Sequence, residues 1–288
     1  MKKFKRIYIE ITNACNFRCS FCLDTKREKR YMSVKEFKIV IDKVKENVES
    51  VFLHVKGEPL LHSNLEEILK ICEDAKLDVN ITTNGFFLAD KKEILVNSKA
   101  LRQLNVSIHS IEENKFNSIT QDEYIKKVIN ACKYINENSN VIISYRLWNL
   151  DDMTNLNKDS KILDALKEAY NIENIKEAIQ NNHYIKLNKT TYINLDTKFV
   201  WPSLNNKIVS KCGSCYGLRQ QIAVLVDGTV VPCCLDNDGD IALGNIFKQS
   251  LEEIVNGERS RKIIAGFLTG KLVEPLCQRC GFRKNKRK

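Results

Sequence analysis

The sequence contains no apolar run of about 18 residues, which is the length that a membrane-spanning helix needs. The continuous apolar stretch of a secretory signal peptide is also missing, because Glu10 and Asn13 interrupt the first apolar residues. No internal repeat and no low-complexity linker occurs in the 288 residues. We therefore expect a soluble cytoplasmic protein that consists of one medium-sized domain and a small appendage.

Eleven cysteines are clustered near both ends of the chain, a distribution that does not resemble the disulfide framework of a small secreted protein. Cys15, Cys19 and Cys22 form a C-x3-C-x2-C motif directly after residues 6–12, an alternating run that predicts a strand. Thiolates are the usual ligands of 4Fe–4S clusters, which normally take four of them. Three ligands leave one iron open, and an open metal position is typical of catalytic sites.

A structural zinc site is the alternative for this loop. Such a site needs a fourth sulfur or nitrogen ligand nearby, and the first histidine of the sequence is His54. The pattern therefore favours an iron–sulfur cluster with one open iron.

Strands and helices alternate through about six units in the first 200 residues. Strands are predicted at 6–12, 51–55, 79–83, 104–108, 141–146 and 191–195. Helices are predicted at 33–47, 64–75, 91–97, 122–136, 161–168 and 172–179. This alternation predicts an α/β fold with a parallel sheet, and six units are fewer than the eight of a closed barrel. We expect a partial (β/α)6 barrel over residues 1–200, with ligands at the carboxyl ends of its strands.

The pattern changes near residue 200. Asp227-Gly228 separates two apolar runs, 221–226 and 229–232, and predicts a β-hairpin. Helices are predicted at 250–256 and 260–267. We expect residues 201–288 to form a small α+β domain, which carries six of the cysteines.

A strand that ends in the cysteine loop, followed one unit later by Gly57-Glu58-Pro59, resembles the opening of the radical S-adenosylmethionine (SAM) superfamily. The family's stretch is Gly-Gly-Glu-Pro, and Lys56 replaces its first glycine here. The resemblance implies that the open iron binds the amino and carboxylate groups of SAM. It also implies a set of SAM contacts: Phe21 near the adenine, Gly57, Glu58 and Pro59 at the amino group, and Thr83, Asn84, Ser107 and Arg146 at the ribose and carboxylate. For the last four, a turn or strand-end role is the alternative.

The C-terminal cysteines carry a second resemblance. The spacing from Cys215 through Gly228 to Cys233, and then to Cys277-x2-Cys280, resembles the auxiliary-cluster domain known as twitch or shortened SPASM. It implies a second 4Fe–4S cluster held by these four cysteines, with a four-thiolate zinc site as the alternative. Cys212 and Cys234 are spare, and either can replace a neighbour.

The resemblance implies a reaction as well. An electron from a flavodoxin or ferredoxin cleaves SAM to methionine and a deoxyadenosyl radical, which abstracts hydrogen from a small-molecule substrate. Lys-Gly-Glu-Pro-Leu-Leu-His at 56–62 and Cys-Cys-Leu-Asp at 233–236 are similar to radical SAM proteins that include queuine lyase. That similarity implies C–N cleavage of queuine to its aminomethyl-deazaguanine precursor. The candidates for substrate contact are His109, Trp148 and Asp236, with a surface histidine, core packing and a solvated loop as their respective alternatives.

Three other functions are alternatives to this one. A peptide- or carbohydrate-modifying oxidase of the same superfamily remains open. The molybdenum-cofactor cyclase is disfavoured, because it ends in Gly-Gly and this chain ends in Lys-Arg-Lys. A metal-stapled nucleic-acid-binding protein would use the net charge of +10 and the basic tail at 283–288. The basic residues are dispersed and no RNA-binding motif is present, so we expect no nucleic-acid partner.

Overall fold

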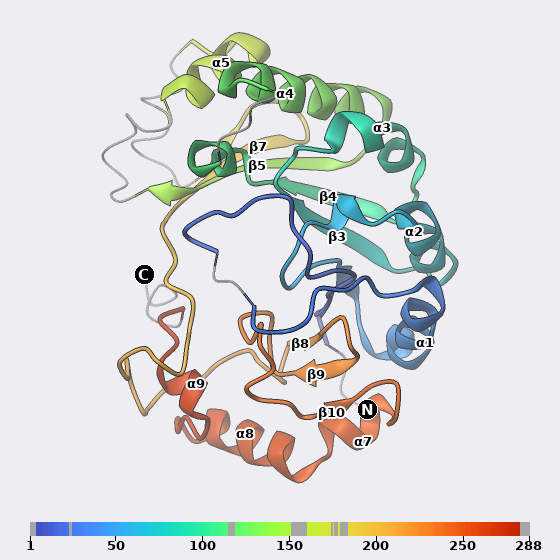
Figure 1. The fold of residues 1–288 in the computed structure, drawn as a ribbon, viewed down its shortest axis with the longest axis vertical. Coiled ribbons are helices and arrows are strands. Elements are labelled where there is room, and N and C mark those ends of the chain that lie inside the picture. Colours follow the sequence, from blue (N-terminus) through green and yellow to red (C-terminus); the bar gives the residue numbers. More distant parts are fainter. Residues whose placement is uncertain are drawn as a thin grey trace. The chain divides into compact units, whose positions relative to one another are not determined.

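A computed structural model describes residues 4–22, 25–114, 119–150, 160–173, 175, 178 and 184–282. These residues form two compact units (Figure 1). Unit 1 holds the described residues of 1–15, 23–79 and 200–288, and unit 2 holds those of 16–22 and 80–199. The basic tail at 283–288 and most of the predicted helix at 172–179 lie outside the described residues. The predicted division into domains at residue 200 stays a proposal.

Unit 1 contains a sheet in the order β10-β9-β8-β1-β2. Its strands are β1 (Arg6–Ile9), β2 (Ser50–Phe52), β8 (Gln221–Val224), β9 (Thr229–Val231) and β10 (Gly244–Asn245). β8 and β9 are antiparallel, so the predicted hairpin at Asp227-Gly228 is confirmed. The sequence did not predict that β8 also pairs with β1, in parallel, with Ile7 opposite Ile222. The hairpin of β8 and β9 thus joins the same sheet as β1, beside which β8 lies.

The helices of unit 1 are α1 (Val34–Val44), α2 (Leu65–Asp74), α7 (Leu251–Val255), α8 (Glu258–Leu268) and α9 (Pro275–Gln278), with 3-10 turns η1 (Lys45–Asn47) and η2 (Pro59–Leu61). α1 begins at the capping box of Ser33 and Glu36, as its spacing predicts. Its apolar face buries Phe37, Val40, Ile41 and Val44. The helix is therefore fixed by a local signal at its start and by packing along its length.

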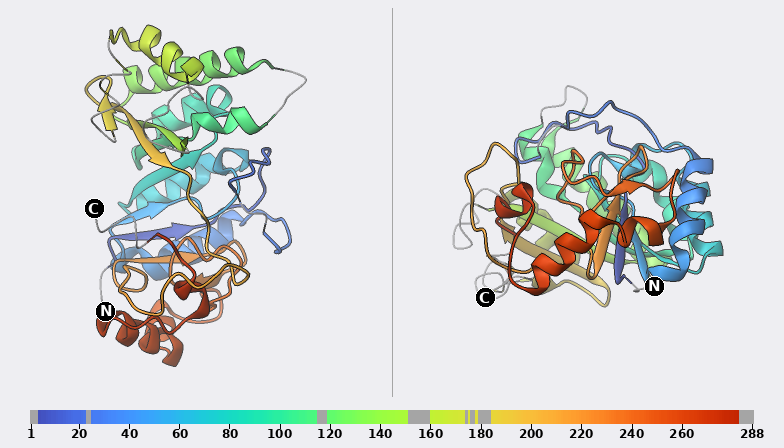
Figure 2. Two further views of the ribbon diagram at one scale, coloured as in Figure 1. Left: turned by 90° about the vertical axis from the view of Figure 1, so that its left-hand side faces the viewer. Right: turned by 90° about the horizontal axis from the view of Figure 1, so that it is seen from below.

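Unit 2 contains strands in the order β3-β4-β5-β7-β6. Its strands are β4 (Leu101–Val106), β5 (Ile142–Leu150), β6 (Tyr184–Lys186) and β7 (Thr191–Thr197), together with the larger part of β3 (Asp78–Thr83). β5 is parallel to β4 and β7, whereas β6 is antiparallel to β7 at the edge. The helices are α3 (Leu88–Asn97), α4 (Gln121–Asn138) and α5 (Ser160–Tyr170), with η3 (Ile108–Glu113). α4 lies between α3 and α5 in Figure 1, and the three again follow one another in Figure 2.

Strands and helices alternate as predicted in the residues that the structure describes. Strand β6 was not predicted, because three residues are too few to show a period. In the described part of the chain, no helix combines the length and the apolar character needed to cross a membrane.

Candidate active site and auxiliary cluster site

The cysteine loop is anchored at its base in unit 1. Gly57 has φ +77, and a Cβ atom there would lie 2.8 Å from the carbonyl oxygen of Ala14 and 2.9 Å from Cα of Asn13. The amide of Glu58 donates a hydrogen bond of 2.8 Å to that same carbonyl of Ala14. Only glycine can approach the chain this closely at a positive φ. The predicted Gly57-Glu58 stretch therefore holds the residue that precedes Cys15.

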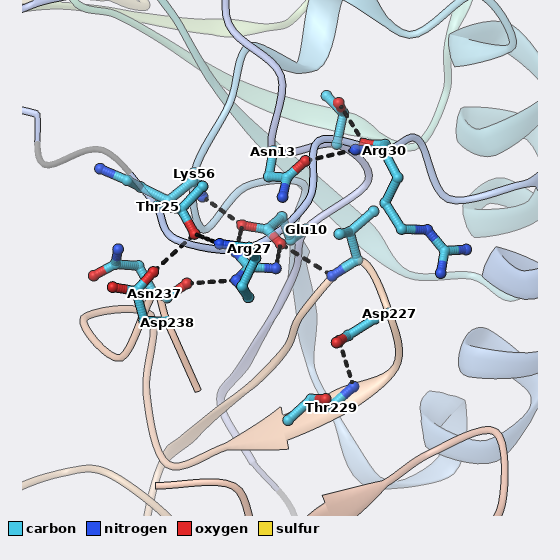
Figure 3. Close-up of polar contacts among 12 residues, drawn as sticks. Glu10, Asn13, Thr25, Arg27, Arg30, Lys56, Asp227, Thr229, Asn237 and Asp238 are labelled. Carbon is cyan, nitrogen blue, oxygen red and sulfur yellow. Dashed lines mark hydrogen bonds and ion pairs between the residues drawn. The ribbon is translucent and has the colours of Figure 1, made fainter. Parts of the chain in front are cut away.

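A buried ion pair lies beside this anchor (Figure 3). Glu10 follows β1, is fully buried and accepts two hydrogen bonds of 2.7 Å from the guanidinium of Arg27. Its oxygens also accept the backbone N–H groups of Lys56 at 3.1 Å and Val226 at 3.0 Å. A buried carboxylate is tolerated only when its lone pairs are satisfied in this way. In the sequence Glu10 looks like an interruption of an apolar run, and its function was missed.

Arg27 also connects this ion pair to the turn at Asn237 and Asp238, which follows the hairpin of β8 and β9 (Figure 3). Its Nε atom donates to the carbonyl of Asn237 at 2.8 Å. The hydroxyl of Thr25 and the amide of Lys26 both donate to Oδ1 of Asp238, at 2.8 and 3.2 Å. The residues that follow the cysteine loop are thus attached to the turn that follows the hairpin, and neither partner has a local sequence signal for this.

Lys56, the departure from the family pattern, is accommodated by two contacts. Its backbone amide is bound by Glu10, and its ammonium lies 4.9 Å from the ring centre of Trp201. The residue is 6% exposed. A cation over an indole face is attracted by the ring's negative quadrupole. A side chain larger than glycine therefore fits here without disturbing Gly57.

The remainder of the cysteine loop, residues 16–22, belongs to unit 2. The amide of Cys22 donates to the carbonyl of Cys19 at 3.0 Å, which closes a turn. Oδ1 of Asn16 accepts from Nδ2 of Asn84 at 2.9 Å, while Nδ2 of Asn16 is buried and makes no hydrogen bond within the described residues. A buried donor without an acceptor is costly, so this atom fits a bound group that carries acceptors.

Thr83 and Ser107 lie at the ends of β3 and β4, as predicted. The Thr83 hydroxyl accepts the amide of Gly85 at 2.9 Å, and the Ser107 amide donates to the Thr83 carbonyl at 2.8 Å. Gly85 has φ +87, which the Asn84-Gly85 turn requires. These contacts are those of the turn alternative, and contact of Thr83, Asn84 or Ser107 with SAM stays a prediction.

Four other predicted residues form one chain of contacts in unit 2. Nδ1 of His109 donates to the carbonyl of Arg146 at 2.8 Å, and the His109 ring centre is 5.1 Å from that of Phe21. The guanidinium carbon of Arg146 lies 4.3 Å from the ring centre of Trp148, whose Nε1 donates to Asn194 at 2.6 Å. His109 is 3% exposed, so the surface alternative for it is wrong. Trp148 is 37% exposed, so the core-packing alternative for it is also wrong.

The four predicted auxiliary ligands line a single cavity in unit 1. Cys215, Cys233, Cys277 and Cys280 surround it together with apolar side chains such as Phe267. Among the described residues, no group of three or more His, Cys, Asp or Glu side chains is arranged to hold a single metal ion. A 4Fe–4S cluster is larger than one ion and needs thiolates set around a space. The donor set and the cavity fit a cluster, and the ligand assignment stays a proposal.

The protonation of these thiols depends on what the cavity holds. Burial, reinforced by the neighbouring cysteines, raises the pKa of Cys233 well above its usual range and that of Cys277 to about 12. Such thiols stay neutral on their own, because clustered thiolates repel and are poorly solvated. A cationic iron–sulfur centre reverses this preference, since its binding releases the thiol protons.

The two spare cysteines lie elsewhere. Cys234 packs against the apolar cluster of Tyr8, Val55 and Leu225, and burial raises the pKa of its thiol to about 11. Cys212 is exposed. Neither residue lines the cavity, so the structure gives no reason for either to replace a neighbour as a ligand.

Asp236 lies at the auxiliary cavity. It is 1% exposed, and its two oxygens accept the amides of Asp240 at 2.9 Å and Ile241 at 2.8 Å. The predicted alternative of a solvated loop is wrong for this residue. Its carboxylate fixes its own turn, and contact with a substrate stays a prediction that these bonds do not support.

Burial raises the pKa of Asp236 from 3.8 to about 6. A carboxyl whose pKa is raised on folding stabilises the fold at low pH, and that contribution is lost as the pH rises through about 6. In the metal-free protein we expect this residue to remove roughly 1 kcal/mol of stability between about pH 5 and about pH 7. Urea unfolding at both pH values should reveal a flatter profile for Asp236→Asn than for the matched exposed control Asp240→Asn. Equal profiles would contradict the assignment.

Comparison with known families identifies the protein family of the chain. A family model described as the radical SAM superfamily matches residues 9–155, slightly more than half of the chain. The chain belongs to the radical SAM superfamily. A second model, described as an iron–sulfur cluster-binding domain and named SPASM, matches residues 205–281. The predicted family, fold class and cofactors, which are SAM and two 4Fe–4S clusters, are confirmed.

Relatives of this radical SAM protein include enzymes named GTP 3',8-cyclase. The one from Campylobacter jejuni subsp. doylei is 31% identical over 169 residues, which cover 56% of this chain and 51% of that protein. The chain thus matches about half the length of that relative. A probable GTP 3',8-cyclase from Methanocaldococcus jannaschii is 24% identical over 269 residues, covering 82% of this chain and 87% of that protein.

Solved structures agree on the fold. BtrN in complex with AdoMet and 2-DOIA superposes with a TM-score of 0.62 at 18% identity, covering 98% of this chain and 94% of that one. SuiB of Streptococcus suis bound to S-adenosylmethionine gives a TM-score of 0.62 at 17% identity, covering 98% and 72%. At these identities the likeness concerns the fold alone.

Proposed function

We propose that this radical SAM protein oxidises a small-molecule substrate by removing a hydrogen atom from it. The observation that carries the proposal is the cavity lined by Cys215, Cys233, Cys277 and Cys280. Four thiolates supply every iron of a cubane with a protein ligand. No iron of the auxiliary cluster is then left for a substrate, and a closed cluster is suited to accepting an electron. An auxiliary cluster that accepts an electron favours oxidation of the substrate over its cleavage.

Different residues of the chain would bind the first cluster, donate a hydrogen bond beside it and support the cysteine loop. Cys15, Cys19 and Cys22 would hold the first cluster, and Asn16 offers an N–H donor to what binds beside it. When bound, the two clusters and SAM supply the deoxyadenosyl radical and a one-electron acceptor, so that the substrate loses a hydrogen atom, an electron and a proton. Gly57 keeps the backbone close to the base of the loop.

The substrate side is proposed to lie at the chain of contacts in unit 2. Trp148 offers a partly exposed flat surface and Arg146 stacks on it, which suits a planar or anionic group. Nδ1 of His109 carries a proton, because the carbonyl of Arg146 can only accept. The His109 ring lies beside that of Phe21, with the ring centres 5.1 Å apart. A flavodoxin or ferredoxin remains the proposed electron donor.

Two more specific reactions remain. The cleavage of queuine stays a prediction, and none of the relatives reported above carries that name. The second candidate is the GTP 3',8-cyclase reaction of molybdenum cofactor biosynthesis, which is favoured by the 31% identity to an enzyme of that name. The Lys-Arg-Lys at the end of the given sequence is outweighed by this identity and does not count against the cyclase reaction.

The test is anaerobic reconstitution, followed by assays of iron and sulfide and of SAM cleavage with dithionite. We expect about eight iron atoms per chain, and about four each in Cys19→Ala and Cys277→Ser. Cys19→Ala should lower deoxyadenosine formation by roughly a hundredfold or more, because the cluster that binds SAM is lost. Cys277→Ser should still cleave SAM but form no oxidised product. Cys212→Ser, the matched control outside the cavity, should resemble the wild type.

The substrate is identified by mass spectrometry with GTP, queuine or a pool of small metabolites. A product two mass units lighter than its substrate, formed with one deoxyadenosine, supports the oxidation. Conversion of GTP to an isomeric product would establish the cyclase, and release of the aminomethyl-deazaguanine would establish the lyase. Zinc in place of iron, or SAM cleavage unchanged in Cys19→Ala, would overturn the radical SAM assignment of these cysteines.

A further inference from the structure

Asn114 contacts the cysteine loop from a position almost a hundred residues away in the sequence. It follows η3 in unit 2, where its own amide is bound by the carbonyl of Ile111. Its Nδ2 atom lies 3.1 Å from the sulfur of Cys19 and 2.7 Å from the carbonyl of Ser110, and its Oδ1 accepts the amide of Arg18 at 2.8 Å. One side chain thus contacts two consecutive residues of the loop.

The orientation of this amide is fixed by its partners. The backbone N–H of Arg18 can only donate, so the atom that faces it must be the carboxamide oxygen. The carbonyl of Ser110 can only accept, so the atom that faces it must be the NH2 group. A flipped amide would oppose both partners. The second N–H of Asn114 is therefore directed to the sulfur of Cys19.

We infer that Asn114 is a positioning residue that raises the reduction potential of the cluster ligated by Cys19. This inference rests on the proposed function, in which that cluster binds SAM. An N–H donor to a ligand sulfur stabilises the additional negative charge of the reduced cluster, and such hydrogen bonds are among the factors that set cluster potentials. The bond to Arg18 keeps the donor in place while the loop carries the metal.

Two variants separate this function from simple anchoring of the loop. Asn114→Asp keeps the size of the side chain and an acceptor for Arg18, but it removes both N–H donors. Asn114→Leu removes the donors and the acceptor without adding charge. Asn138→Asp is the matched control, because Asn138 is exposed at the end of α4 in the same unit and donates only to the Tyr134 carbonyl among the described contacts.

The measurement is an anaerobic redox titration of the reconstituted protein by electron paramagnetic resonance, following the signal that changes when SAM is added. At the midpoint potential of the wild type, we expect the ratio of reduced to oxidised cluster to fall roughly fivefold in Asn114→Leu. A larger fall is expected in Asn114→Asp, because its negative charge also opposes reduction. Asn138→Asp should titrate like the wild type.

The titration distinguishes failure of this inference from failure of the proposed function. A wild-type protein without any SAM-sensitive signal would remove the cluster itself and with it the proposed function. If that signal is present and Asn114→Asp titrates at the wild-type potential, only this inference is overturned. Loss of iron in Asn114→Leu, with a wild-type potential in Asn114→Asp, would assign Asn114 to loop anchoring alone.

Discussion

Replacing Arg27 with methionine is expected to lower the free energy of unfolding by about 3 to 5 kcal/mol, the cost of leaving a buried charge without its partner. The side chain of Glu10 is fully buried and that of Arg27 is 14% exposed, so solvent cannot replace the lost guanidinium. Methionine keeps most of the side-chain length and removes the charge and its donors. Urea unfolding of the anaerobically reconstituted protein, followed by circular dichroism, measures the change.

Two controls make the result specific to the pair. The double variant Glu10→Gln/Arg27→Met should cost less than the sum of its single variants. Each single variant leaves the charge of its partner unpaired, whereas the double variant leaves no unpaired charge. Lys38→Met removes an ion pair with Asp42, in which the two side chains are 62% and 46% exposed, and it should leave stability unchanged. A loss in Arg27→Met no larger than that in Lys38→Met would contradict the assignment.

This pair also indicates why residues 25–27 are ordered at all. They follow the cysteine loop, carry three bonds to the turn at Asn237 and Asp238, and have no regular secondary structure of their own. The same turn belongs to the segment that places Cys233 at the auxiliary cavity, since the amide of Asp236 donates to the Cys233 carbonyl at 3.2 Å. Within unit 1, residues 25–27 and Cys233, a proposed ligand of the auxiliary cluster, therefore share one hydrogen-bond network.

Features written in a short stretch of sequence could be predicted. The capping box at Ser33, the hairpin at Asp227-Gly228 and the two groups of cysteines each depend on residues only a few positions apart, or on a spacing that chemistry restricts. The alternation of apolar strands and helices sufficed for the parallel sheet. For the auxiliary site, the spacing of four cysteines around a hairpin predicts the donor set, and in the structure all four line one cavity.

Features that depend on distant residues could not be predicted. Glu10 and Val226 are 216 positions apart, and nothing near either residue indicates the bond between them. The pairing of β8 with β1 and the contact of Asn114 with Cys19 have the same cause. The burial of His109 could not be predicted, because polar and apolar residues alternate around it in the sequence. Its Nδ1 partner, the carbonyl of Arg146, lies 37 positions away in β5.

Replacing Gly57 with alanine should have the other large effect. Its φ of +77 is strained for any residue with a Cβ atom, by about 1 to 2 kcal/mol. The new methyl group would also meet backbone atoms of Thr12, Asn13 and Ala14, which cannot move aside as a flexible side chain would. We expect the free energy of unfolding to fall by about 3 to 5 kcal/mol in total. Iron bound at the first cluster should fall with it, because the residue before Cys15 is displaced.

Gly270→Ala is the matched control for this experiment. Gly270 has φ +75, almost the same backbone strain, but no atom lies within 4 Å of the position that its Cβ would occupy. This variant should therefore cost only about 1 to 2 kcal/mol, and it should retain both clusters. The difference between the two variants in urea unfolding isolates the clash with residues 12–14. Equal losses, with full iron content in both, would mean that the Gly57 backbone does not support the cysteine loop, and its close approach to Ala14 would then have no function in holding the cluster.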